Sequence, residues 1–384
     1  MKLLLGDLRS SNPEVAGPDL QRNKDGRALI GDPRNDENLI VSQLQVAFIK
    51  FHNAVVDHVQ NDTSLEGGDL FRLAQQTVRW HYQWVVIHDF LRRLVGSNLI
   101  DDILPEVEYG TPGGHHSVVR PRRLFYDWRK QPFIPVEFSV AAYRFGHSMA
   151  RPSYLINDVI PVPVVSNAAR IPFFSQTGGD LTHLNGFRPL PNEWGVQWKY
   201  LLPGINNGAG PNDADLPQPS YRIDTELGHP LGALPDSVAG AEDLFAGIPA
   251  GEAQSLAVRN LLRGRALAIP SGQDVARAMG INPLTDDELF GEAEIPDDAK
   301  TDLAGHAPLW FYVLKEAELK ANGRRLGPVG GRIVAEVLIG LLDGDPPFLP
   351  QRQSHLDPYP PRREPEYLHA HRHRQHRPLD QNVR

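Results

Sequence analysis

The sequence predicts a mainly α-helical protein in which long loops rich in proline and glycine connect the helices. Three observations support this fold class. Apolar residues recur every three or four positions in several long segments, which is the period of an amphipathic helix. Glycine and proline number 34 each and concentrate between those segments. The sequence also lacks the regular alternation of strand and helix patterns that is typical of a parallel sheet.

The first predicted helices lie in the N-terminal third of the chain. Residues 36–59 carry apolar side chains at helical spacing, and two acidic residues stand at the start, where a helix favours negative charge. A second helix is expected over about residues 69–95, with Gly96 as its C-terminal stop. The segment 99–135 is interrupted by Pro and Gly and is predicted to be loop with at most short strands.

Loop and helix alternate again in the rest of the chain. The stretch "AAYRFGHSMARPSYLIN" predicts a helix that ends at Pro152, and residues 152–240 are again rich in Pro and Gly. No period of 20 to 50 residues recurs, so a repeat architecture is not expected. Further helices are predicted within 243–267, 272–280, 307–321 and 327–342.

We divide the chain into an N-terminal loop (1–30), one helical domain (31–345) and a C-terminal tail (346–384). The tail is polar, Pro-rich and Arg/His-rich without any period, so we predict that it is disordered. A metal site formed by its histidines is the alternative, but the interleaved arginines would repel a cation and favour a solvated tail. The histidines concerned are His369, His371, His373 and His376.

Composition narrows the classes of partner and of chemistry. The net charge is −8, with 39 basic and 47 acidic residues, which argues against nucleic acid and anionic membranes as partners. The chain has no cysteine, so disulfides, thiolate nucleophiles and Cys-ligated metals are excluded and any metal must bind His or carboxylate. The N-terminal "MKLLLGDLRSS" is too short an apolar run for a signal peptide or a membrane span, and no membrane span is expected.

His147 is the first candidate functional residue. It follows Arg144 by three positions and Val140 by seven, so the three would share one face of a helix. A lone histidine on such a face is most often a buried core residue. A metal-ligating imidazole needs its other nitrogen held by a partner, and an adjacent arginine would suit an anionic cofactor group. Spacing alone leaves both interpretations open.

Two further clusters carry candidate residues. In "GDPRNDE" Arg34 precedes Glu37 by three positions at a helix start, so both could point into one cavity; a capping arrangement with a surface ion pair is the alternative. In "RNLLRGRALAIPS" the candidates lie near the end of a helix, where cations often simply meet the helix C-terminus. They are Asn260, Arg263 and Arg265.

Three separated segments, taken in this order, resemble the animal-type haem peroxidases of the peroxidase–cyclooxygenase superfamily, especially bacterial members. They are "GDPRNDEN…QVAFIKFHN", "FSVAAYRFGHSMARPSYL" and "LAVRNLLRGRALAIPS". The resemblance runs from about Gly31 to Leu342. It implies a mainly α, animal haem peroxidase-like domain that binds haem b and oxidises a small donor with hydrogen peroxide.

The resemblance also implies roles at single positions. His147 matches the proximal histidine that ligates haem iron, and Asn260 matches the asparagine that accepts a hydrogen bond from that histidine's other nitrogen. Arg34 matches the distal catalytic arginine, and Glu37 matches the glutamate that can esterify a haem methyl group. The candidates for the haem propionates, or for the wall around them, are Arg144, Arg263 and Arg265.

The sequence departs from the family in three ways. The family's distal histidine lies upstream of the arginine motif, yet residues 1–33 contain no histidine. The aspartate of the second haem ester and the family's calcium loop are also missing there, so we expect a member without its distal segment, through truncation, a misplaced start or divergence. Asn38 stands where mammalian granule enzymes have a haem-linked methionine, and Arg144 stands where cyclooxygenases place their radical tyrosine, with Tyr143 one position earlier.

These departures leave three functions in order of preference. The first is a haem peroxidase impaired by the loss of a general acid–base group, which typically costs about 10²- to 10⁴-fold in rate. The second is a haem-binding pseudoenzyme or truncated fragment, and the third and weaker one is a fatty-acid oxygenase.

Family members are often secreted, whereas this sequence shows no export signal. The remaining helix histidines are expected to be packing residues; they are His52, His81 and His88.

Overall fold

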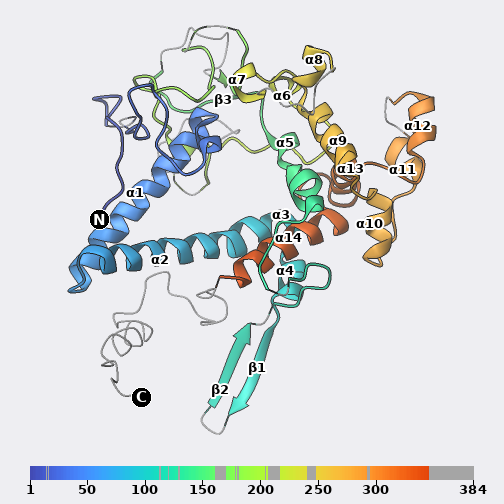
Figure 1. Cartoon of the computed structure of the whole chain (residues 1–384), viewed down its shortest axis with the longest axis horizontal. Helices are drawn as coiled ribbons and strands as arrows, with labels where there is room; N and C mark the ends of the chain where they lie inside the picture. Colours follow the sequence, from blue (N-terminus) through green and yellow to red (C-terminus); the bar gives the residue numbers. More distant parts are fainter. Residues whose placement is uncertain are drawn as a thin grey trace, which may run out of the picture.

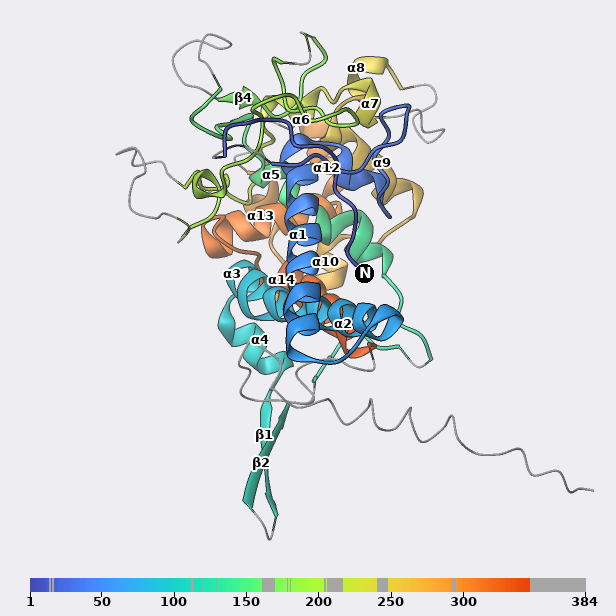
Figure 2. The same ribbon diagram turned by 90° about the vertical axis from the view of Figure 1, so that its left-hand side faces the viewer.

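The structure of this chain, a computed structural model, is mainly helical (Figures 1 and 2), as the sequence predicts. The strands that it describes form two small antiparallel pairs rather than a central sheet. The described residues are 1–13, 15, 17–111, 114–119, 121–128, 130–160, 170–177, 179, 181–203, 205, 217–239, 248–291 and 295–345. The tail from residue 346 onward, predicted to be disordered, lies outside them.

Two long helices, α1 (Leu39–Asp62) and α2 (Gly67–Val85), pack together at the ends that a short loop joins (Figure 1). Helix α1 begins after Asn38, whose side chain accepts a hydrogen bond from the backbone N–H of Ile40 at 2.9 Å. Valine and leucine side chains from both helices bury one another at the junction. Both predicted helices are confirmed.

Helix α2 continues through a π-helical turn, η2 (Val86–Leu91), and the short α3 (Arg92–Val95). The helical run ends at Gly96, whose φ of 87° belongs to the left-handed region that favours glycine, as the sequence predicts. Among the described residues, one helix, α1, is long and apolar enough by length and composition to cross a membrane, with 44% of its most apolar window buried. A buried core helix meets the same criteria, and the absence of a membrane span stays a prediction.

The loop predicted over 99–135 is partly wrong. The structure has a helix there, α4 (Ser97–Ile103), followed by the hairpin β1 (Glu106–Thr111) and β2 (Gly114–Val119). Pro105 precedes β1 directly and Gly114 opens β2, while Gly110 lies within β1 without ending it. The hairpin projects away from the helices in both views (Figures 1 and 2).

The segment around His147 is not one regular helix. It consists of a π-helical turn η3 (Glu137–Ala141), a 3₁₀ turn η4 (Ala142–Arg144) and the short α5 (Gly146–Met149). Ala141 leaves helical geometry, with φ −124° and ψ −76°. The predicted helix is therefore confirmed only in outline, and the uniform spacing that would align Val140 with His147 does not hold.

Short elements occur in the long loop that follows, where turns were predicted, and the helix after it lies within the segment 243–267 that was predicted to be helical. Strand β3 (Ser153–Tyr154) pairs with β4 (Ile171–Pro172), and helix α9 (Leu256–Ala266) begins at Ser255, whose hydroxyl accepts from Val258 N–H. The other short elements are η1 (Pro33–Asp36), η5 (Trp198–Tyr200), α6 (His229–Gly232), α7 (Asp236–Ala239) and α8 (Ala250–Ala253).

The C-terminal helices agree with the sequence except for two that it did not predict. These two are α11 (Asp286–Phe290), which Thr285 and Glu288 stabilise through a capping box, and α12 (Asp297–Leu303). The three predicted helices are α10 (Gly272–Ala278), α13 (Leu309–Ala321) and α14 (Pro328–Asp343).

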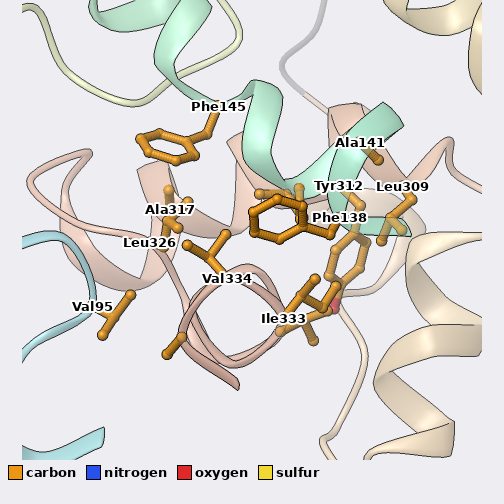
Figure 3. Close-up of a cluster of buried hydrophobic side chains, with 14 of the residues drawn as sticks. Val95, Phe138, Ala141, Phe145, Leu309, Tyr312, Ala317, Leu326, Ile333 and Val334 are labelled. Atoms are coloured by element: carbon orange, nitrogen blue, oxygen red, sulfur yellow. The ribbon is translucent and has the colours of Figure 1, made fainter. Parts of the chain in front are cut away.

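The largest hydrophobic core holds the His147 segment in place. Phe138 and Phe145 come from either side of the η4 turn and are both buried among residues of α13 and α14. Figure 3 shows Phe138 beside Val334 and Ile333, and Phe145 beside Ala317. A segment with little regular helical hydrogen bonding is thus anchored by two aromatic side chains.

The remaining helix histidines make packing contacts. His52 is buried, with its ring edge-to-face with Phe71 at 5.5 Å, and His81 Nδ1 lies 2.8 Å from the carbonyl of Thr77. His88 is exposed and stacks on Trp84 at 5.0 Å. None of the three joins the candidate site.

Candidate functional site

Two of the predicted site residues meet across a long sequence separation. His147 lies on α5 and Asn260 on α9, 113 residues apart, with 2.9 Å between His147 Nδ1 and Asn260 Nδ2. Asn260 is only 1% exposed, so its amide is fixed by its surroundings. One nitrogen of the imidazole is held in this way, which a ligating histidine requires.

Arg144 sets the orientation of the Asn260 amide. Its Nε donates to the carbonyl of Ser139 at 3.0 Å, and one of its terminal nitrogens donates to Asn260 Oδ1 at 3.3 Å. The backbone carbonyl of Arg144 in turn accepts from the indole N–H of Trp310 at 3.3 Å. With its oxygen engaged by Arg144, Asn260 presents its nitrogen to His147 and donates, whereas the family resemblance expects it to accept.

This orientation decides where the neutral His147 ring carries its proton. An Nδ1 that accepts from Asn260 leaves the proton on Nε2. A ring that binds a metal through Nε2 must carry the proton on Nδ1, and Asn260 must then turn its oxygen toward His147. That turn would place the amide nitrogen, a donor, against the donor nitrogen of Arg144, so the two contacts compete.

The surroundings keep His147 uncharged. Burial, together with the positive charges of Arg144 and Arg263, lowers its pKa to about 4. The imidazole is therefore neutral near pH 7, which is the form that binds metals. Its Nε2 has no hydrogen-bond partner in the described part of the chain and is not sealed from solvent.

The two arginines of the third cluster, Arg263 and Arg265, differ in burial and in the effect of their charge on His147. Arg263 is half-buried and close enough for its charge to act on His147, whereas Arg265 is exposed at the end of α9. Arg259, which the sequence analysis did not single out, is buried and donates to the carbonyls of Ala253 and Ala239. Its position one residue before Asn260 was the only signal in the sequence that it anchors this helix.

Arg34 adopts the capping alternative. Its guanidinium donates to Asp32, with a shortest N–O distance of 2.6 Å, and its side chain is 77% exposed. Asp32 also caps the η1 turn by accepting from the backbone N–H of Arg34 at 3.0 Å. The partner of Arg34 is thus Asp32 rather than Glu37, and the structure does not show Arg34 and Glu37 pointing into one cavity. Glu37 is half-buried, and this burial raises the pKa of its carboxyl.

The Arg34 turn is held by a buried ion pair that the sequence analysis missed. Asp36 accepts two hydrogen bonds from the guanidinium of Arg22, at 2.7 and 2.8 Å, and Arg22 also donates to Asp19 at 3.0 Å. All three side chains are almost fully buried. Arg22 and Asp36 are too far apart in sequence for any helical or strand period to have paired them.

A short chain of hydrogen bonds links the two halves of the candidate site. Asn38, just after the Arg34 turn, donates from its side chain to the carbonyl of Phe173 at 2.8 Å. The N–H of Phe173 donates to the carbonyl of Pro152, which lies just after α5, at 2.9 Å. The chain that carries His147 is therefore tied to the start of α1.

Glycine is required where a neighbouring loop crosses this turn. The N–H of Gly186 donates to the carbonyl of Glu37 at 2.9 Å. A Cβ at Gly186 would lie 1.8 Å from the carbonyl oxygen of Asp36, which no backbone adjustment of a few tenths of an ångström relieves. The close approach therefore depends on the missing side chain.

Groups of three or more His, Asp or Glu side chains that could hold a metal ion are not found in the described ranges. A haem needs only one histidine ligand from the protein, so its site does not require such a group. The absence of the family's calcium loop stays a prediction.

Comparison with known proteins bears on these motifs. A family model described as animal haem peroxidase matches residues 6–176, which include Arg34 and His147. Peroxidasin of Drosophila melanogaster is 24% identical over 344 residues, covering 86% of this chain. Residues 6–176 of the chain are thus similar to the animal haem peroxidase family. Two partial relatives are dual oxidase of Drosophila melanogaster, 27% identical over 133 residues, and a peroxidase-like protein of Margaritifera margaritifera, 28% identical over 207 residues.

The chain is much shorter than the relatives it matches. The alignments cover 34% of the chain and 7% of dual oxidase, and 49% of the chain and 23% of the Margaritifera protein. Only 19% of peroxidasin is covered. The chain therefore spans about a fifth or less of the first two relatives.

One solved structure is similar to this chain in fold. The fatty acid α-dioxygenase of Arabidopsis thaliana superposes with a TM-score of 0.50 at 18% identity, covering 91% of this chain and 53% of the dioxygenase. Peroxidase A of Dictyostelium discoideum gives a TM-score of 0.49 at 16% identity, over 90% and 57% of the two chains. At these identities the likeness to the dioxygenase concerns the fold alone.

Proposed function

We propose that this chain binds haem b through His147 and acts as a peroxidase that oxidises a small donor with hydrogen peroxide. The observation that carries the proposal is the contact between His147 Nδ1 and Asn260 Nδ2 at 2.9 Å. It joins two motifs that the family resemblance pairs and that are far apart in the sequence. A buried core histidine would also need a partner for a buried nitrogen; the open Nε2, together with the pairing of these two motifs, is what favours a ligand.

The proximal residues fit a haem. His147 is neutral, so its ring can bind iron through Nε2 once the ring proton is on Nδ1 and Asn260 has turned its oxygen toward it. Arg144 and Arg263 place positive charge beside the ring, where anionic propionates would be stabilised. Haem, when bound, supplies the redox chemistry with peroxide.

The residues on the other side have separate tasks. In the proposal Arg34, permanently charged, stabilises the negative charge that develops on peroxide oxygen, but only after its side chain leaves Asp32. Glu37, with its half-buried carboxyl, is the residue that would form a haem ester. No histidine precedes Arg34 in residues 1–33 to move the peroxide proton, so we expect turnover about 10²- to 10⁴-fold below that of a complete peroxidase site.

A haem-binding pseudoenzyme is the second candidate function. The specific observation in its favour is the engagement of Arg34 by Asp32, which leaves the guanidinium at the surface. In that case His147 and Asn260 would bind haem while peroxide chemistry stays at the level of free hemin.

A hemin titration of the purified chain tests the proposal. We expect saturable one-to-one binding with the Soret spectrum of histidine ligation, lost in His147→Ala and kept in the matched control His88→Ala, whose ring is exposed on α2's continuation. Equal binding by wild type and His147→Ala would reject His147 as the ligand. Donor oxidation by the loaded chain, measured against free hemin at equal concentration, then separates the peroxidase from the pseudoenzyme.

A further inference from the structure

A cleft of about 740 Å³ opens between the junction of α3 with α4 and the turn that joins α13 to α14. We call it the α4–α13 cleft. Apolar side chains form much of its wall, among them Leu99, Phe125 and Met279. Phe125 is 45% exposed, so its ring is presented to the cleft and to solvent rather than used by the core. The volume is in the range of pockets that hold small organic ligands.

The charge of this cleft opposes that of the whole chain. Its lining includes Lys320, Arg325 and Arg332, and no acidic residue lines it. The chain as a whole has a net charge of −8. A concave apolar surface with only cationic charge favours an anionic ligand over a cationic or neutral one.

Two of the three cations are already neutralised. Arg332 forms ion pairs with Asp102 at 3.0 Å and with Glu336 at 3.1 Å, and Lys320 pairs with Glu288 at 3.0 Å. These contacts hold both side chains at the edge of the cleft. They leave little charge for a ligand.

Arg325 is different. Across the residues that the structure describes it forms no ion pair and no side-chain hydrogen bond, and its side chain is exposed. Its guanidinium packs against Gly96, where an added Cβ would lie 3.0 Å from the terminal nitrogen. The glycine that ends the α2–α3 run thus makes room for this cation at the mouth of the cleft. Arg325 therefore has its full set of donors available for a planar anion.

We propose that the α4–α13 cleft binds an aromatic carboxylate, with the carboxylate on Arg325 and the ring against Phe125 and Met279. A carboxylate matches the fork of the guanidinium in a bidentate pair. An aromatic ring is favoured over an alkyl chain because Phe125 offers a ring face or edge and the thioether of Met279 is polarizable. The proposal does not depend on haem or on His147.

Calorimetric titration of the full chain with 2-naphthoate tests the proposal. We expect one saturable site, weakened by about tenfold or more in Arg325→Gln, because a charged bidentate pair is lost. Arg324→Gln is the matched control, since Arg324 is an exposed neighbour that does not line the cleft, and it should bind within about twofold of wild type. Arg325→Lys keeps the charge without the fork and should bind between the two.

Two further ligands separate the contributions of charge and ring. The neutral 2-naphthamide should bind about tenfold or more weakly than 2-naphthoate if the ion pair contributes. Decanoate should bind more weakly than 2-naphthoate if the ring contacts contribute. Three results would overturn the proposal: absence of saturable binding of 2-naphthoate, an equal loss of affinity in Arg325→Gln and Arg324→Gln, or tighter binding of decanoate than of 2-naphthoate. Circular dichroism of each variant confirms that the fold is kept, which exposure of both arginines leads us to expect.

Discussion

His147 Nδ1 lies 2.9 Å from Asn260 Nδ2, and Arg144 donates to the oxygen of the same amide at 3.3 Å. Asn260 is therefore shared between a candidate ligand and a cation. The amide nitrogen of Asn260 donates to His147 while its oxygen accepts from Arg144. Since the oxygen and the nitrogen lie on opposite sides of the amide, the oxygen cannot face both partners at once. The orientation of one amide thus connects the charge beside the ring to the proton on the ring.

Replacing Asn260 by alanine should weaken hemin binding by about 10- to 100-fold, the usual cost of losing the partner that orients a ligating histidine. The histidine-ligated Soret spectrum should remain at saturation, because His147 itself is unchanged. A hemin titration followed by absorbance measures both quantities. Leu261→Ala, on an exposed position of the same helix, is the control. Unchanged affinity in Asn260→Ala would show that the amide does not support the ligand.

Replacing Asp32 by alanine should release Arg34. If Arg34 acts on peroxide, we expect donor oxidation by the hemin-loaded chain to rise by about tenfold in Asp32→Ala. Arg34→Ala should abolish this gain, so the double variant should match Arg34→Ala alone. Steady-state rates at fixed hemin occupancy give the comparison. A gain that persists without Arg34 would mean that Asp32 acts by another route.

Substituting Gly186 by alanine should destabilise the chain by more than about 2 kcal/mol, because the new Cβ would meet the carbonyl oxygen of Asp36 at 1.8 Å. Thermal unfolding monitored by circular dichroism measures the loss. Gly232→Ala is the control, since a Cβ there has no neighbour within 4 Å. Its stability should stay within about 1 kcal/mol of wild type. Similar melting of both variants would contradict the close approach.

Glu316 should make stability depend on pH. This buried carboxyl accepts hydrogen bonds from the N–H groups of Val329 and Gly330 at the start of α14, and burial raises its pKa to about 7. A raised pKa means that the folded chain binds the proton more tightly than the unfolded chain does. The stabilising contribution is therefore complete below about pH 4.5, the ordinary value, and is lost as pH rises through about 7.

The variant Glu316→Gln removes this titration while keeping an acceptor for the helix start. Relative to the variant, wild type should lose about 3 kcal/mol between pH 4.5 and 7.5. Urea unfolding at a series of pH values provides the free energies. A difference that is constant over this range would show that Glu316 keeps its charge state throughout.

Helical periodicity predicted the long elements but not the irregular ones. Helix α1 follows directly from apolar spacing, since it buries one continuous face, and helix α14 follows from its apolar composition, since it is buried on nearly all sides. The π-helical turn η3 did not, because it depends on a local hydrogen bond from Arg144 to the carbonyl of Ser139 and on the tertiary burial of Phe138. For the β1–β2 hairpin the sequence allowed only short strands within a loop, because the Pro and Gly residues of 99–135 were interpreted as interruptions.

The candidate site, too, was predicted only in part from the sequence. His147 and Asn260 were paired by the resemblance of their motifs to a known family, and no spacing rule could have joined residues on two separate helices. The same resemblance assigned Arg34 to the site. In the structure Asp32, two residues earlier, caps the turn and accepts hydrogen bonds from the Arg34 side chain. The pair of Arg22 and Asp36 had no signal at all, because buried ion pairs across irregular loops leave no period in the sequence.

Two hydrogen bonds, from the Asn38 side chain to Phe173 and from the Phe173 backbone to Pro152, connect the Arg34 turn to the His147 helix, although a long stretch of chain separates them. Local opening of one should therefore open the other, so the two form a single cooperative unit in amide exchange. A ligand held by His147 alone would slow exchange at Leu39 and Ile40, on the far side of the link, without touching either residue.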